Sequence, residues 1–329
     1  MLCISACLSA QQKFNVQNKA KAEFYDDLET AIQKAVSGDT IYLPGAEVQV
    51  KNDLVISKKL AFIGAGCDVD SIGGLRRTEI KKGNDAVNIN FREGSSGSLL
   101  TGCVVGTITF GFKDDVNDLF QDIENVTIWR NKTGDIYLGV SYTQNNKVKN
   151  IFIRENIITY VYGNNASNCW VNNNLISGYV NALYDSQIYN NVILSYINLL
   201  YGCTLQNNYF AYSYFNSPGE NNIFNNNAFL YSNITFPYGT NTGSNNLVNQ
   251  EFIRTFQVNN SDRPKYLTIR DTSPCKKAGT DGTDIGLYGG LTPYKSRPFN
   301  PHIEQSVIST QTDKDGKLNV NIRVSAQTR

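Results

Sequence analysis

The sequence predicts an all-β fold, a solenoid in which short strands stack coil upon coil. Between residues 126 and 248 one phrase recurs: apolar, any, apolar, two mostly polar residues, Asn, any, apolar. The closing positions of this phrase are Asn131, Asn156, Asn174, Asn191, Asn208, Asn227 and Asn246. Their spacing of 17 to 25 residues is too short for a helix pair or a propeller blade, and it suits one turn of a β-solenoid.

The recurring asparagine has a structural explanation. Alternating apolar and polar residues indicate half-buried strands, and Asn suits the bends between them because it tolerates a left-handed backbone and bonds to nearby backbone groups. Coils stacked about 4.8 Å apart place equivalent residues above one another. We therefore expect the amides to form a ladder along the axis, with caps at both ends because a terminal coil has an unpaired side.

Composition limits the classes of function. The chain has 329 residues, of which 41% are hydrophobic, enough for the core of one solenoid. A formal net charge of +1 with 18% charged residues disfavours a nucleic-acid partner, because phosphate binding needs a concentrated basic face. No run approaches the ~18 apolar residues of a membrane span. Nineteen Tyr and 26 Gly, beside one Met and one His, favour an extracellular protein.

The N-terminal residues indicate a targeting segment. Residues 1–10 are small and apolar and end in Leu8-Ser9-Ala10, which predicts the remnant of a signal peptide cleaved after Ala10. The run Ile4-Ser5-Ala6-Cys7 also fits a bacterial lipoprotein cleavage box, and this alternative would leave a lipid anchor on Cys7. The expected location is secreted, periplasmic or at the surface of a bacterial cell.

The elements then follow in order. Residues 23–37 carry a helical apolar stripe ended by Gly38, which predicts a helix covering the open end of the solenoid. Short strands are expected at 40–43, 54–56 and 60–63, before the regular coils. Residues 296–329 place an Asp315-Gly316 turn between two apolar runs, which predicts a terminal hairpin, either covering the last coil or forming an appendage.

Two cysteines of the regular coils, Cys169 and Cys203, lie five residues before a ladder asparagine, with Ser186 at that place in the coil between. Two coil steps are about 9.6 Å, beyond the ~7 Å that a disulfide can span. We therefore expect a buried stack. The cysteine spacing predicts neither a disulfide framework nor a metal site.

Two stretches resemble a known group. The run 31–66, with "AIQKAVSGDTIYLPG" and "LAFIGAG", resembles the capping helix and first coil of the pectin-lyase-like superfamily. Residues 273–290, with "SPCKKAG" and "DIGLYGG", resemble the end of the last coil in many secreted bacterial members. The resemblance covers about residues 23–295 and implies a single-stranded right-handed parallel β-helix. It selects no activity, because the superfamily holds lyases, hydrolases, epimerases and non-catalytic adhesins.

One candidate site is cationic. A polysaccharide lyase needs a cation for the uronic carboxylate and a base for the C5 proton, and the resemblance implies calcium or Arg as the first and Lys or Arg as the second. The local supply is Arg130, Lys147, Lys149, Arg154 and Glu155, with Trp129 one coil before Arg154. No aspartate cluster accompanies them, so calcium is expected only in a lyase and no other cofactor is expected. The simpler alternative is an exposed ion pair contributing under ~1 kcal/mol.

The other candidate site is aromatic. Tyrosines fall at the ends or beginnings of successive second strands, beside one acid: Tyr162, Tyr184 and Tyr201 at ends, Tyr179 and Tyr196 at beginnings, and Asp185. Tyrosine columns at ~4.8 Å steps would offer platforms to sugar rings. Alternatively, the rings pack at a coil corner with each hydroxyl bonded. The first functional hypothesis is polysaccharide binding along this Tyr/Asn face. The alternatives are a lyase acting on an acidic glycan, and a structural surface protein or adhesin.

Overall fold

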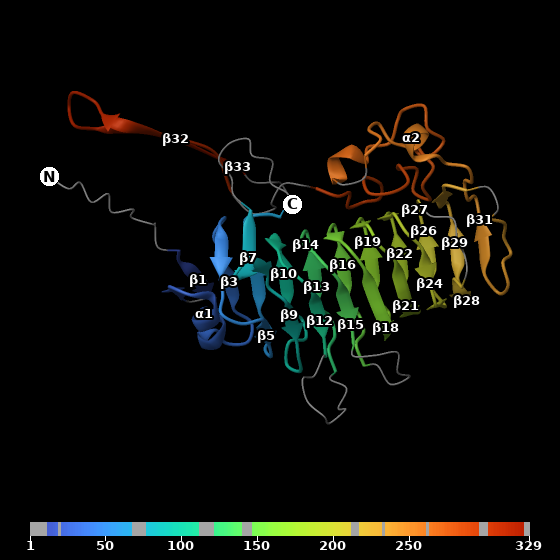
Figure 1. Ribbon diagram of the computed structural model, residues 1–329, viewed down its shortest axis with the longest axis horizontal. Helices are drawn as coiled ribbons and strands as arrows, with labels where there is room; N and C mark the ends of the chain where they lie inside the picture. The colour runs from blue at the N-terminus through green and yellow to red at the C-terminus, as the bar shows by residue number, and fades with distance from the viewer. Residues whose placement is uncertain are drawn as a thin grey trace.

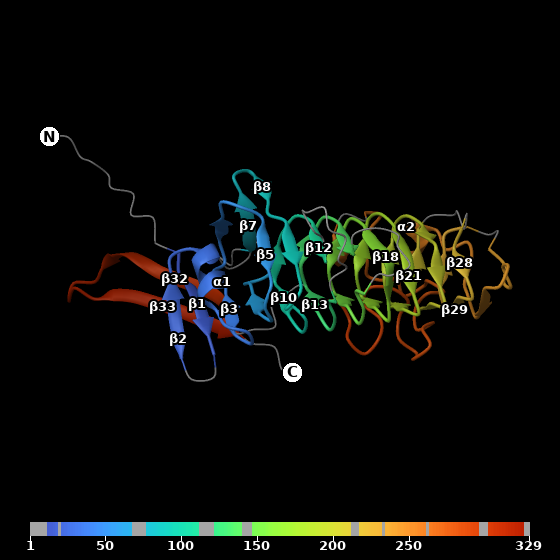
Figure 2. The same ribbon diagram turned by 90° about the horizontal axis from the view of Figure 1, so that it is seen from below.

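A computed structural model describes residues 12–18, 21–67, 77–111, 122–139, 147–211, 217–231, 234–260, 263–295 and 302–325. The fold is a right-handed parallel β-helix, as the sequence predicted. Its coils form one row from the blue to the yellow strands in both views (Figures 1 and 2). The predicted signal segment and Cys7 lie outside the described residues.

Each regular coil contributes one strand to each of three sheets. Sheet A contains, in spatial order, β2 (Ala22–Tyr25), β1 (Phe14–Gln17), β3 (Thr40–Tyr42), β6 (Ala61–Ile63), β10 (Leu99–Thr101), β13 (Thr127–Trp129), β16 (Phe152–Arg154), β19 (Trp170–Asn172), β22 (Gln187–Tyr189), β26 (Thr204–Gln206), β29 (Ile223–Asn225) and β31 (Thr242–Ser244). From β3 to β31 its neighbours pair in parallel.

Sheets B and C continue each coil. Sheet B contains β4 (Glu47–Gln49), β7 (Thr78–Lys82) with β8 (Asp85–Ala86) beside it, β11 (Cys103–Val104), β14 (Lys132–Thr133), β17 (Ile157–Ile158), β20 (Leu175–Ile176), β23 (Val192–Ile193), β27 (Tyr209–Phe210) and β30 (Ala228–Phe229). Sheet C contains β5 (Leu54–Ile56), β9 (Ile89–Phe91), β12 (Ile108–Phe110), β15 (Ile136–Leu138), β18 (Val161–Ser167), β21 (Val180–Tyr184) with β24 (Ile197–Asn198) beside it, β25 (Leu200–Tyr201) and β28 (Gly219–Glu220).

The predicted amide ladder lies inside the turn from sheet A to sheet B. The Asn191 Oδ1 accepts from the backbone N–H and the amide of Asn174 at 2.9 and 3.0 Å. The Asn191 amide donates to Asn208 Oδ1 at 2.9 Å and to the Val171 carbonyl at 2.7 Å. The same pattern links the other predicted asparagines, so the coils from Asn131 to Asn246 are each bonded to the next through these side chains.

A second interior column lies in the turn from sheet C to sheet A. The backbone N–H of Cys169 donates to Ser186 Oγ at 3.0 Å, and that of Cys203 donates to Asn222 Oδ1 at 2.9 Å. Both thiols are buried and free, as the spacing predicted.

The N-terminal cap differs from the predicted helix over 23–37. The helix α1 (Leu28–Lys34) is shorter, and residues 22–25 form β2, which pairs with β1 in antiparallel register. The helix begins at Asp27, whose carboxylate accepts from the Thr30 N–H at 2.7 Å, a typical N-cap. Phe24, placed on the predicted apolar stripe, is instead 63% exposed. Strand pairing at the sheet edge replaced the first turn of the helix that the sequence suggested.

The C-terminal part also differs. Residues 273–290 do not close the last coil. After β31 the chain passes through α2 (Phe252–Thr255) and η1 (Pro264–Tyr266) and returns over the outer side of sheet B, visible as the orange segment in Figure 1. We call residues 275–295 the strap. A second hydrophobic cluster joins strap residues such as Ile285 and Leu287 to Val192 and Tyr209 of sheet B.

A hairpin follows the strap. Strands β32 (His302–Thr312) and β33 (Leu318–Ser325) pair in antiparallel register. Both views place the hairpin at the end of the solenoid that carries β1 and β2, so it forms an appendage and does not cover the last coil (Figures 1 and 2).

Candidate functional site

The strap is held by the residues that directly precede the ladder asparagines. These residues have a left-handed backbone with φ between 52° and 57°: Arg130, Glu155, Asn173, Asn190, Asn207 and Asn226. The Asn226 amide donates to the Ala278 carbonyl at 2.9 Å. The Asn173 amide donates to the carbonyls of Leu287 and Gly289 at 3.0 and 2.9 Å. The strap therefore crosses the coils in reverse order as the chain proceeds.

A groove of 470 Å³ lies between the strap and the outer face of sheet A. Its sheet side consists of the outward first and third residues of successive A strands and the turns that follow: Phe152, Arg154, Trp170, Asn172, Asn173, Tyr189, Asn190, Gln206 and Asn207. Its strap side consists of Thr280, Asp281, Gly290, Leu291 and Thr292.

The aromatic part of this groove is a flat platform. The rings of Phe152 and Trp170 stack with centroids 4.8 Å apart and planes 6° apart, because β16 and β19 pair in register. Both side chains are partly exposed. From the strap, Leu291 stands 96% exposed at the same groove. Flat rings beside amide groups provide apolar stacking and hydrogen bonding on one surface, the combination that binding sites for small organic groups use.

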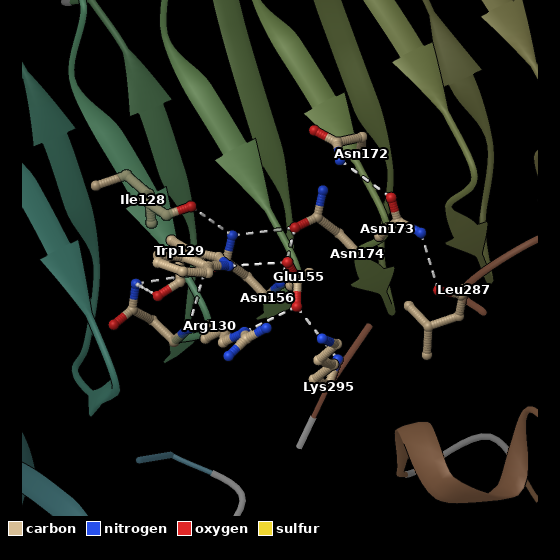
Figure 3. A network of polar contacts seen from close by, with 11 residues as sticks. Ile128, Trp129, Arg130, Glu155, Asn156, Asn172, Asn173, Asn174, Leu287 and Lys295 are labelled. Atoms are coloured by element: carbon tan, nitrogen blue, oxygen red, sulfur yellow. Dashed lines mark hydrogen bonds and ion pairs between the residues drawn. The ribbon is translucent and has the colours of Figure 1, made fainter. Parts of the chain in front are cut away.

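A polar cluster lies at one end of the groove (Figure 3). Glu155 is 3% exposed, and its carboxylate accepts from Trp129 Nε1 at 2.9 Å and Arg130 Nε at 2.8 Å. It also accepts from the backbone N–H of Lys295 at 3.2 Å. The cluster therefore ties two neighbouring coils to the end of the strap, and its ion pair is buried, unlike the exposed pair weighed from the sequence.

Arg154 completes this end of the groove. Its guanidinium carbon lies 4.5 Å from the centroid of the Trp129 ring, a cation–π contact, and Arg130 approaches the same ring at 4.6 Å. Within the described residues, the buried Nε of Arg154 has no hydrogen-bond partner. Burial raises the pKa of Tyr189 although Arg154 lowers it, so the phenol in the groove keeps its proton at neutral pH.

The structure divides the predicted cationic patch. Arg130, Arg154 and Glu155 lie at the carboxyl ends of β13 and β16. Lys149 lies before β16 and pairs with Glu124 at 3.4 Å. Lys147, two residues earlier, approaches Asp122 at 3.5 Å. Lys149 precedes the left-handed backbone of Asn150, whereas Arg154 ends β16, and neither lysine lines the groove.

The predicted tyrosines form two separate groups. Tyr162 pairs with Tyr137 at the start of sheet C strands, with ring centroids 4.4 Å apart, and not with Tyr184 as the sequence suggested. The reason is that β18 runs on to Ser167, which lies opposite Tyr184, so Tyr162 lies near the start of its strand opposite Asn181. Tyr179 donates from its hydroxyl to that of Tyr162 at 3.0 Å.

The remaining tyrosines also stack in pairs. Tyr179 stacks on Tyr196, and Tyr184 stacks on Tyr201, each pair with centroids 4.8 Å apart. Asp185 lies exposed in the turn after β21. The tyrosines thus pack on one another, and none of them lines the groove beside the strap.

Sequence reasoning missed Phe152, Trp170, Tyr189, Gln206 and Asp281. Phe152 and Trp170 occupy the unspecified position of the recurring phrase, and Tyr189 and Gln206 occupy its first mostly polar position. Alternation places both positions on the outer face. Reading those positions coil by coil would have found them. Asp281 could not be placed, because no sequence pattern indicates that the strap returns over the coils.

The described residues contain no group of three or more His, Cys, Asp or Glu side chains arranged to hold a metal ion. No helix among them has the length and apolar character required to cross a membrane.

No family model matches the chain, and no curated protein matches it. Among solved structures, it is similar to the catalytic domain of a glycoside hydrolase family 87 α-1,3-glucanase in complex with tetrasaccharides, with a TM-score of 0.36 and 11% identity over 70% of this chain and 43% of that one. The same domain in complex with nigerose gives a TM-score of 0.29 and 12% identity over 69% and 44%. The chain thus spans less than half the length of these structures, and neither match bears on its substrate.

Proposed function

We propose that this chain binds a polysaccharide along the outer face of its middle coils, in the groove between sheet A and the strap. The observation that carries the proposal is the stacked pair of Phe152 and Trp170 on the floor of that groove. Sugar rings present apolar C–H faces that stack on aromatic rings, and their hydroxyls are suited to amide partners. Asn172 and Gln206 supply amides from neighbouring coils of the same floor.

This proposal places the ligand on a different face from the Tyr/Asn face that the sequence suggested. The Tyr/Asn face of sheet C remains an alternative surface for the same ligand class, supported by the stacked pairs Tyr179–Tyr196 and Tyr184–Tyr201. The groove is favoured because residues of the strap form a second wall beside its stacked rings.

Titration calorimetry with a panel of neutral and acidic polysaccharides tests the proposal. Trp170→Ala should weaken binding about ten-fold, since an aromatic stacking contact contributes on the order of 1 kcal/mol beyond its buried area. Tyr196→Ala is the matched control, because it removes a partly exposed ring from sheet C and should leave binding unchanged. If only the Tyr196 variant lost affinity, the tyrosine face would be the site. Absence of binding to the whole panel would favour a structural or adhesive role.

A polysaccharide lyase is the second candidate, supported by Arg154, which lines the groove and whose Nε has no hydrogen-bond partner among the described residues. In such a reaction a base takes the C5 proton of a uronic acid, a C4–C5 double bond forms, and the C4–O bond to the leaving sugar breaks. Arg154 would bind the carboxylate. The lysines suggested as the base lie at the other end of β16, so binding without cleavage remains the first proposal. Ultraviolet absorbance of unsaturated uronates, with and without calcium, separates the two.

A further inference from the structure

The charged side chains of the groove are ordered along its length. Among its lining residues, Arg154 and Asp281 carry charge. Arg154 ends β16. Asp281 lies beside the coil of Asn207, because the neighbouring Thr280 donates its backbone N–H to Asn207 Oδ1 at 2.9 Å. Three sheet A steps separate β16 from β26, roughly 14 Å at the usual strand spacing. The groove therefore has a positive end and a negative end.

The side chains at the positive end of the groove are held in place, and their positive charge is not fully neutralised. Glu155 pairs with Arg130 and holds the indole of Trp129, and the guanidinium of Arg154 lies over that indole. Since Glu155 pairs with Arg130, these three charged groups keep one net positive charge. The buried Nε of Arg154 lacks a partner among the described residues. Arg154 also lines the groove, and a guanidinium binds carboxylate or sulfate through charge-assisted hydrogen bonds.

The negative end stays ionised at neutral pH. Partial burial raises the pKa of Asp281, but hydrogen bonds from the Thr283 hydroxyl at 2.7 Å and backbone N–H at 3.1 Å outweigh it and leave the pKa below its usual value. Asp281 is exposed, so water and salt screen its charge. It repels an anion weakly and accepts hydrogen bonds from neutral hydroxyls.

We infer that the ligand is a glycan of mixed charge, with one acidic sugar at Arg154 and neutral sugars toward Asp281. This inference rests on the proposed function and names the substrate class of the same groove. A chain in which every sugar is acidic fits less well, because its second anion would approach Asp281. The recognised chemistry is a single oxyanion, which a uronic acid or a sulfated sugar supplies.

The experiment compares oligosaccharides of one backbone and one length by calorimetry at low salt. The probes are neutral, singly uronylated, singly sulfated and fully uronylated. The wild-type chain should bind the singly charged probes about ten- to a hundred-fold more tightly than the neutral one. Whichever of the uronylated and sulfated probes binds more tightly identifies the group that supplies the oxyanion. Arg154→Gln should abolish this preference, because it should weaken the singly charged probes far more than the neutral one. Asp281→Asn should raise the affinity for the fully uronylated probe about two- to five-fold, and high salt should remove this gain.

Lys149→Gln is the matched control, since it removes a positive charge outside the groove and should change none of these ratios. The charge order is overturned if the fully uronylated probe binds wild type most tightly. It is equally overturned if Arg154→Gln weakens neutral and acidic probes by the same factor. Both results leave glycan binding in place. Failure of every probe to bind overturns the proposed function, and the inference with it.

Discussion

Adjacent asparagines in the same turn have different roles. Asn191 lies in the inner column, fully buried, and its amide bonds to the coils before and after it. Asn190 lies in the outer column, with φ of 57°, and packs against Gly289 and Gly290 of the strap. The inner column holds the coils in register and so determines the fold. The outer column decides where the strap lies, and therefore whether sheet A faces open solvent or a groove.

The inner column should show the largest effect on stability. Asn191→Leu leaves the N–H of Asn174 buried without its acceptor and removes the amide contacts on both sides. We expect the free energy of unfolding to fall by about 3–5 kcal/mol, measured by urea denaturation. Asn246→Leu, at the partly exposed end of the same ladder, is the control and should cost less than half as much. Equal losses at the two positions would contradict a cooperative ladder.

The strap interface should be sensitive to alkali. Burial raises the pKa of Cys275, the first residue of the strap, to about 11. A folded-state pKa above the unfolded value of 9.0 stabilises the protein below about pH 9, and the stabilisation is lost as pH rises through about 11. Wild type should therefore lose about 2–3 kcal/mol more over that range than Cys275→Ala, which cannot ionise. Parallel curves for the two proteins would exclude Cys275 as the titrating group.

The outer column should show a local effect. Asn173→Gly removes two hydrogen bonds to strap carbonyls while keeping the left-handed backbone free of strain. We expect a loss of about 1–2 kcal/mol, faster limited proteolysis within the strap, and weaker glycan binding. Asn245→Gly is the matched control, because this exposed residue occupies the same position in a coil where no strap contact is seen among the described residues. Equal proteolysis of both variants would show that the outer amides do not hold the strap.

The inner column could be predicted from sequence, and the outer column could not. The ladder asparagines repeat with a coil period, and each pairs with its own equivalent, so position in the repeat is enough to assign their contacts. Asn173 and Asn190 share the same repeat, but Asn173 bonds to Leu287 and Gly289 and Asn190 bonds to Gly286. These partners lie more than 90 residues later, in a segment without that repeat. No periodicity connects the two. The resemblance of residues 273–290 to a last coil gave the wrong location for the same reason.

The groove was predicted in part. Trp129, Arg154 and Glu155 were singled out because the repeat places them beside one another, and the structure places them at one end of the groove. Lys147 and Lys149 were grouped with them by closeness in sequence, although a strand between places them at its other end. Tyr162 was grouped with Tyr184 as a residue that ends its strand, although β18 continues to Ser167 and Tyr162 lies opposite Asn181.

Substitutions at the corner between sheets C and A should have the smallest effect, which is measured on glycan affinity. There Tyr184 and Tyr201 stack on one another with centroids 4.8 Å apart, in a turn that the described strap does not cross. The double variant Tyr184→Ala and Tyr201→Ala removes as much aromatic surface as a groove variant, but it leaves both walls of the groove intact. Glycan affinity measured by calorimetry should change less than two-fold, against about ten-fold for Trp170→Ala. A ten-fold loss in the double variant would return the binding face to the tyrosine columns, because ligand contact would then depend on coil stacking alone and not on the strap.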